Sequence, residues 1–440
     1  MANLSLAPKF IAGFTLFALA ACSEKEFILE GERTAVLAPV ETVSLIAEAG
    51  AEGAQIGEAT INQSFTHPGG GAGHQGGHLT LNWPMSLSWS AQIEGAPDIT
   101  TDLAQPVIAN DALYALGADG VLTSFDLAIG TVNFAATVEG YDDDPLPGIV
   151  GGIAAGEDHI LAHTSQFDLV ALSSEDGAIL WSVTHPERLK GGPTLIGDEG
   201  VLVSDINGQL YLYDVQTGAR LWQRAGLPTN TVVFGAPAPA FAANQVVLAG
   251  AGGEISIYDP VTGDLLWADS LASFNPRTPL QELADVRAHP VHDGKLVFIQ
   301  SLSGRMVAFQ AATGIEIWEQ PITSIEMPWL AGQTIFTMTV EGRLYALRRN
   351  DGAARWVVAL PDALPEGVFA QEDAPRYSGP VVASDRVFII SRAGELHAFD
   401  AATGEEMSGL SFDGPVTTAP VIAQENLAVL NSQGQLFVYR

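Results

Sequence analysis

The chain has 440 residues, with 51 acidic and 19 basic side chains and a formal net charge of −32. Nucleic-acid binding needs clustered Lys and Arg to neutralise phosphates, and attachment to anionic lipid needs a basic patch, so this composition argues against both. The length suits two or three ordinary domains or one large closed β architecture, and the periodicity of the sequence decides between them.

The first residues have the pattern of a bacterial lipoprotein signal. Lys9 precedes the apolar run 10–20, which has the length of a signal-peptide core and is too short to span a bilayer. The run leads into a Leu-Ala-Ala-Cys sequence that matches a lipobox, and Cys22 is the only cysteine. We therefore expect a signal peptide over 1–21, export, and lipidation of Cys22. Ser23, which is not Asp, predicts sorting to the outer membrane, with the protein facing the periplasm.

Residues 22–80 are predicted to be a lipid anchor followed by a flexible tether. This segment has weak periodicity, and its stretch 68–78 is rich in glycine, as flexible linkers are. It also contains His67, His74 and His78. Imidazoles can converge on zinc or copper, whereas ordering a Gly-rich segment around a metal costs conformational entropy. The sequence leaves weak metal binding and a mobile or wrapped linker as alternatives.

From about residue 81 to the end, the sequence repeats a hairpin pattern. Each clear copy has a glycine, an alternating apolar stretch, an Asp-x-x-Thr-Gly turn and then a tryptophan, as in 208–222 and 253–267. The alternation predicts strands, and the glycine of the turn supplies a positive φ. We expect the aromatic residue of each copy to pack between neighbouring repeats. These residues are Trp181, Trp222, Trp267, Trp318 and Trp356, with Phe134 and Met407 in degenerate copies.

A second strand element precedes each hairpin and begins with proline in seven of eight copies. The copies run from Pro106 to Pro420 with a mean spacing of about 45 residues, and a period of that size is typical of a four-stranded propeller blade. The last copy ends after three strands, whereas 87–90 resembles a fourth strand with no others before it. The sequence therefore predicts an all-β fold: one eight-bladed β-propeller over 81–440, with four-stranded antiparallel blades and a ring closed by the N-terminal strand.

The Gly-x-x-x-Ala/Tyr-Asp-x-x-Thr-Gly-x-x-x-Trp element resembles the repeat of pyrroloquinoline-quinone dehydrogenases and their non-enzymatic relatives. With the lipobox, the single propeller and the tether, the whole chain resembles the BamB family of lipoproteins in the outer-membrane β-barrel assembly (BAM) machinery. The resemblance implies a non-catalytic scaffold, without a cofactor, that binds the POTRA domains of BamA and other BAM subunits. It also implies that unfolded outer-membrane proteins are clients and that the membrane is contacted through the lipid anchor only.

The resemblance places partner-contacting residues on two connections between repeats. The contacting segments of the family match 231–235 and 285–287, although the first lacks the arginine of the family and the second has Arg287 in place of an acidic residue. The connection that contains the second segment spans 23 residues from Trp267 to Pro290, longer than most, and long loops often carry function. The residues expected to contact the partner are Val233, Phe234, Asp285 and Arg287.

Two other functions remain as alternatives. A periplasmic propeller could bind a small molecule or polysaccharide in its central channel, which would require polar groups converging from several inner strands. A quinone-dependent dehydrogenase would need calcium ligands, a catalytic aspartate and, in many members, adjacent cysteines, and this chain has a single cysteine. The sequence contains no nucleophile elbow, P-loop or His-Glu-x-x-His motif, so it names no catalytic, cofactor-binding or metal-binding residue.

Overall fold

The structure of the chain is a computed structural model, and its propeller belongs to one compact unit, Val40–Arg440. It describes residues 43, 45, 52–93, 103–138, 151–164, 167–226, 237–272, 282, 284–361 and 376–440. The predicted signal peptide 1–21 and Cys22 lie outside the described residues. Within the described ranges, no helix is long and apolar enough to cross a membrane.

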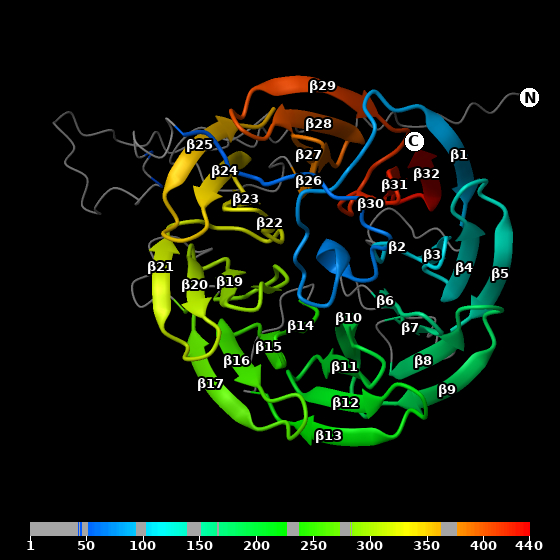
Figure 1. Ribbon diagram of the computed structural model, residues 1–440. Coiled ribbons are helices and arrows are strands. Elements are labelled where there is room, and N and C mark those ends of the chain that lie inside the picture. The colour runs from blue at the N-terminus through cyan, green and yellow to red at the C-terminus, as the bar shows by residue number, and fades with distance from the viewer. Residues whose placement is uncertain are drawn as a thin grey trace, which may run out of the picture. The chain divides into compact units, whose positions relative to one another are not determined.

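Eight four-stranded antiparallel sheets form the blades of a ring (Figure 1). The first four blades are β2 (Val107–Ala109), β3 (Ala112–Leu116), β4 (Val121–Asp126), β5 (Val132–Thr137); β6 (Gly152–Ala155), β7 (His159–His163), β8 (Asp168–Ser173), β9 (Ile179–Thr184); β10 (Leu189–Ile196), β11 (Gly200–Asp205), β12 (Leu210–Asp214), β13 (Arg220–Arg224); and β14 (Ala240–Ala242), β15 (Gln245–Ala249), β16 (Glu254–Tyr258), β17 (Leu265–Ser270). The other four are β18 (Val291–His292), β19 (Leu296–Gln300), β20 (Met306–Gln310), β21 (Glu316–Gln320); β22 (Trp329–Ala331), β23 (Thr334–Met338), β24 (Arg343–Arg348), β25 (Ala354–Ala359); β26 (Tyr377–Ala383), β27 (Arg386–Ser391), β28 (Glu395–Asp400), β29 (Glu406–Ser411); and β30 (Val421–Ala423), β31 (Asn426–Leu430), β32 (Gln435–Tyr439), β1 (Leu87–Gln92). The prediction of an eight-bladed propeller is confirmed.

The Asp-x-x-Thr-Gly segments form the turns that join the third and outer strands. In the turn before β13, the carboxylate of Asp214 accepts hydrogen bonds from the backbone N–H of Thr217 at 2.8 Å and from its hydroxyl at 2.7 Å. These bonds lower the pKa of Asp214. Gly218 follows with φ +68°, a conformation that glycine adopts without strain. The sequence pattern therefore fixes the turn through one acceptor and one permissive backbone position.

Each tryptophan of the outer strands joins its blade to the next one. The indole N–H of Trp181 on β9 donates to the carbonyl of Val215 in the following blade at 2.8 Å, and its ring lies against Gly218, where an added Cβ would stand 2.8 Å from the ring. Trp222 donates in the same way to Pro260, also at 2.8 Å. The prediction of inter-blade packing is therefore confirmed. The turn requires glycine for two reasons, its positive φ and the lack of space for a side chain beside the tryptophan ring.

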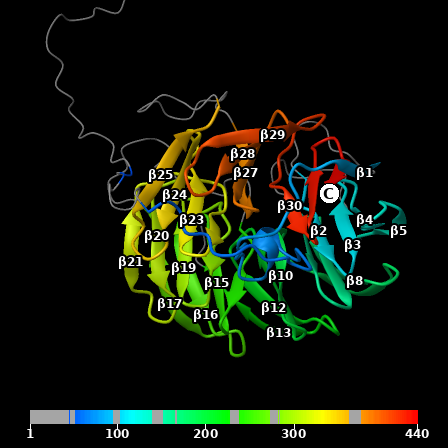
Figure 2. The same ribbon diagram turned by 45° about the horizontal axis from the view of Figure 1, so that its top comes forward.

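The two ends of the propeller sequence meet in one blade. β1 pairs antiparallel with β32, with Ser90 opposite Phe437, and the backbones of Ser86 and Arg440 exchange two hydrogen bonds of 3.0 Å. Figures 1 and 2 show β1 beside the C-terminus at this seam. The predicted closure by the N-terminal strand is confirmed, and it leaves no open blade at either end.

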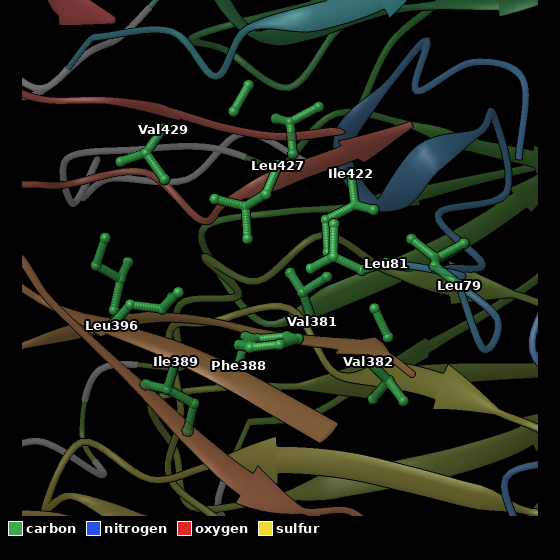
Figure 3. Packing of buried hydrophobic residues seen from close by; sticks show 14 of the residues in the cluster. Leu79, Leu81, Val381, Val382, Phe388, Ile389, Leu396, Ile422, Leu427 and Val429 are labelled. Atoms are coloured by element: carbon green, nitrogen blue, oxygen red, sulfur yellow. The ribbon is translucent and has the colours of Figure 1, made fainter. Parts of the chain in front are cut away.

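The prediction of a flexible tether over 22–80 is wrong for residues 52–80. The first residues of this segment lie against the outer parts of two blades, where Ala54 N–H donates to the carbonyl of Ala402 in the turn before β29 at 3.1 Å. Residues 62–80 lie inside the ring, where they include the short 3₁₀ helix η1 (Pro68–Gly70), drawn in blue at the centre of Figure 1. Phe65 is fully buried, and Leu79 packs beside Val382 of β26 and close to Ile422 of β30 (Figure 3). Composition misled the prediction because these glycines allow close packing rather than flexibility. The remainder of the predicted tether, apart from residues 43 and 45, lies outside the described residues.

Candidate partner-binding surface

Asp285 and Arg287, two of the predicted contact residues, belong to one end of the ring. We call it the connection face, because there the outer strand of each blade connects to the inner strand of the next. The connection from β13 to β14 carries Val233 and Phe234, which lie outside the described residues. The next connection, from β17 to β18, carries Asp285 and Arg287 in its described part, 284–290. The two connections belong to adjacent blade junctions, as the sequence predicted.

Asp285 is held firmly by its neighbours but its carboxylate has no hydrogen bond. Its backbone carbonyl accepts from Leu302 N–H at 3.0 Å, and the adjacent Val286 is fully buried among the residues of the two flanking blades. The Asp285 side chain is 2% exposed, and within the described part of the chain neither carboxylate oxygen has a hydrogen-bond partner. Burial raises the pKa of Asp285 to about 7, against the opposing attraction of Arg287 and Lys190.

Lys190 is the second buried charge of this face. It lies near the start of β10 and is 5% exposed. Burial lowers its pKa, while attraction to Asp285, Glu254 and Asp205 favours its charged form. Asp205 is satisfied locally, since its carboxylate accepts hydrogen bonds from two backbone N–H groups at 2.9 Å and from the hydroxyl of Tyr211 at 3.0 Å. The carboxylate of Asp285, in contrast, is buried without a hydrogen-bond donor in the described structure.

Arg287 follows Asp285 by two residues and faces the central channel. It is half-buried, and its Nε is buried without a hydrogen-bond partner in the described structure. Together with His289 and Trp329 it lines a channel cavity of about 190 Å³. The Nδ1 of His289 accepts a hydrogen bond from Ala238 N–H at 2.9 Å, so its proton is on Nε2. The Asp285 carboxylate and the Arg287 Nε are thus both buried without a hydrogen-bond partner in the described structure.

The three histidines of the Gly-rich segment do not converge on one point. The Nε2 of His67 accepts from Leu195 N–H at 2.9 Å, the Nδ1 of His74 donates to the carbonyl of Pro290 at 2.8 Å, and the Nε2 of His78 accepts from Asp385 N–H at 3.0 Å. Each imidazole is thus hydrogen-bonded to a different blade. Of the alternatives left by the sequence, the structure shows the wrapped segment, and no group of three metal-ligating side chains occurs in its described part.

Sequence analysis selected Asp285 and Arg287 but missed Lys190. Lys190 lies 95 residues earlier in the chain, and the ring brings the two together because β10 begins on the same face that carries the connection before β18. A lysine in an otherwise apolar inner strand was the available signal, because a buried lysine needs a charge partner.

A family model described as "Outer membrane protein assembly factor BamB" matches residues 142–358 and 368–439. The outer membrane protein assembly factor BamB of Shewanella oneidensis is 25% identical over 360 residues, which cover 80% of this chain and 88% of that protein. The crystal structure of BamB from Moraxella catarrhalis matches with a TM-score of 0.68 at 20% identity, covering 81% of this chain and 99% of its own. A quinohemoprotein alcohol dehydrogenase from Comamonas testosteroni matches with a TM-score of 0.66 at 13% identity, covering 89% and 83%. The structural likenesses show the propeller fold, which an assembly factor and an enzyme share.

Proposed function

The chain belongs to the family of the outer membrane protein assembly factor BamB, and from this premise we propose that it is a non-catalytic scaffold of the BAM machinery that binds the POTRA domains of BamA. The observation that carries the proposal is the family match, which extends over most of the propeller. Other BAM subunits and unfolded outer-membrane proteins are its further proposed partners. Lipidation of Cys22 would hold it at the outer membrane, facing the periplasm.

We place the contact with BamA on the connection face. Val233, Phe234, Asp285 and Arg287 are the proposed contact residues. The geometry of Arg287 suits an acidic group of the partner, because this side chain is half-buried and its Nε has no hydrogen-bond partner in the described structure. Asp285 is 2% exposed, so it would act through its charge beneath the contact surface. Excluding water from an ion pair between Arg287 and the partner would strengthen their attraction, so a few such residues could dominate the affinity.

The alternative of a ligand in the central channel has less support. Residues 62–81 occupy the channel at the face opposite the connection face, and a cavity lined by described residues of the channel measures about 190 Å³. Typical small-molecule pockets are larger, on the order of 300–1,000 Å³. A role as a dehydrogenase rests on a likeness of fold at 13% identity, which carries no information on chemistry.

The test is recovery of BamA from native outer membranes with the tagged, lipidated protein. Arg287→Glu is the informative variant, because Arg287 is half-buried and its charge reversal should weaken binding without unfolding the propeller. Lys295→Glu is the matched control, since this exposed lysine belongs to the same blade at the opposite end of β18. Loss of BamA with Arg287→Glu alone supports the proposed surface. Equal recovery with both variants moves the contact elsewhere, and failure of the unmodified protein to recover BamA overturns the function.

A further inference from the structure

Residues 62–81 make one complete circuit inside the ring, and we call this segment the channel hoop. Asn62 bonds to β30, Phe65 to β2, Thr66 to β6 and His67 to β10, after which Ala72 bonds to β14. The second half continues in the same direction, and Leu81 returns to the closing blade, where it forms a bridge with Glu425. The hydrogen bonds are Gln424 N to Asn62 O (2.9 Å), Phe65 N to Ile108 O (2.7 Å), Ala155 N to Thr66 O (3.2 Å), Leu195 N to His67 Nε2 (2.9 Å), Phe241 N to Ala72 O (2.7 Å), His292 N to Gly73 O (2.9 Å), Gly77 N to Leu330 O (2.9 Å) and Leu79 N to Val382 O (3.0 Å).

The hoop thus bonds to the inner strand, or its end, in all eight blades and visits them in ring order. Its contacts lie near the ends of the inner strands that are remote from the connection face. The two ends of the hoop are both at the closing blade, which contains the seam between β1 and β32. Figure 3 shows Leu79 and Leu81 among the side chains of β26, β27, β30 and β31 there.

Glycine is required where the hoop passes closest to the wall. A Cβ on Gly76 would stand 1.9 Å from the ring of Trp329, and a Cβ on Gly73 would stand 2.7 Å from the carbonyl oxygen of His292. Gly71 differs, because a Cβ there meets nothing within 4 Å and its φ of −151° is an extended conformation. The glycines therefore divide into those fixed by packing and one that tolerates a side chain, which provides a matched pair for mutation.

We propose that the end of the channel is a binding site for this segment of the chain itself, and that the bound hoop locks the ring closed. In a propeller each blade contacts only its neighbours, so a ring closed by one strand pairing can open at that seam. A segment bonded to every blade changes this, because two blades cannot separate without also breaking hoop contacts. The hoop thereby couples the seam to blades on the far side of the ring.

The first measurement is hydrogen exchange of the unmodified protein. If the hoop locks the ring, the amides of Phe65, Gly77 and Leu79 should be protected as strongly as those of the inner strands, and should exchange in the same cooperative opening. Exchange of these amides at the rate of an unfolded peptide would overturn the proposal, whatever the behaviour of any variant.

The second measurement compares Gly76→Ala with Gly71→Ala. Overpacking at Trp329 should accelerate exchange about tenfold or more at the hoop, and also at the seam between β1 and β32, whereas Gly71→Ala should leave both unchanged. Acceleration confined to the surroundings of Trp329, with the seam unchanged, would show local packing only and would refute the lock. Neither measurement depends on BamA, so the lock and the proposed function can fail separately.

Discussion

Replacing His74 by Asn should make the stability of the protein less sensitive to acid. The His74 ring is fully buried in the hoop, where Nδ1 donates to the carbonyl of Pro290 and Nε2 has no partner in the described structure. Its centroid lies 5.1 Å from that of His289, at an interplanar angle of 64°. Burial lowers the pKa of His74 from 6.5 to about 4. Between these two values the unfolded chain takes up a proton that the folded chain does not, so the free energy of unfolding falls as the pH is lowered.

The size of this effect follows from the linkage. One pKa unit corresponds to about 1.4 kcal/mol, so His74 should contribute a loss of about 2 kcal/mol between pH 7 and pH 5. Asp285 acts in the opposite direction, since its raised pKa makes the folded chain take up a proton in this range. Comparing the variant with the unmodified protein at each pH removes that contribution, and the Asn side chain can still donate to Pro290.

The assay is guanidinium unfolding at pH 5, 6 and 7 with linear extrapolation. The difference in the free energy of unfolding between His74→Asn and the unmodified protein should shift in favour of the variant by about 2 kcal/mol from pH 7 to pH 5. A constant difference across the three pH values would refute the reasoning, because it would mean that His74 can be protonated in the folded chain.

Three further predictions concern other parts of the molecule. Gly218→Ala should destabilise the propeller by about 2 kcal/mol, because φ is +68° and the new Cβ meets Trp181, whereas Gly197→Ala, with φ +51° and nothing within 4 Å, should cost less in the same thermal unfolding assay. Asp285→Asn should stabilise the protein more at pH 8 than at pH 5, since the raised pKa means that the buried carboxylate is costly only when ionised; equal effects at both pH values would contradict this. Cys22→Ala should move the protein from the membrane fraction to the soluble periplasmic fraction, and continued sedimentation with outer membranes would argue against lipidation at this residue.

The blades could be predicted because their information is local and repeated. The alternation of apolar residues, the Asp-x-x-Thr-Gly turn and the following tryptophan each have a direct structural cause, as the bonds around Asp214 and Trp181 show. Repetition then allowed the blades to be counted, and the incomplete last copy identified β1 as the missing strand. The closure required no knowledge of side-chain packing.

The hoop could not be predicted in this way, because glycine is common both in flexible linkers and in tightly packed segments. A glycine increases the freedom of an unpacked chain, but it is also the residue that lets a backbone approach an aromatic ring, as Gly76 approaches Trp329. Composition does not distinguish these two cases. The signal that was present is the apolar residues at Phe65, Leu79 and Leu81, which a solvated linker has no reason to contain.

The contact residues illustrate a different limit. The sequence places Asp285 in a long connection, and exposed residues are the usual expectation there. Its burial depends on Val286 inserting into the core of two blades, and its charge balance depends on Lys190, which lies 95 residues earlier in the sequence. No pattern in the residues near Asp285 indicates either contact. The sequence could therefore identify Asp285 as a candidate, but it could not predict that this residue is buried or which charges surround it.

The hoop also bears on how one fold serves different functions. A propeller that binds a ligand in its channel must leave the ends of its inner strands accessible. Here those ends, on one side of the ring, already donate to or accept from the chain itself in all eight blades. A ligand entering from that side would have to displace the hoop and leave buried backbone groups such as His292 N–H without an acceptor. We therefore expect the proposed partner binding to use the connection face and the outer strands, which the hoop leaves free.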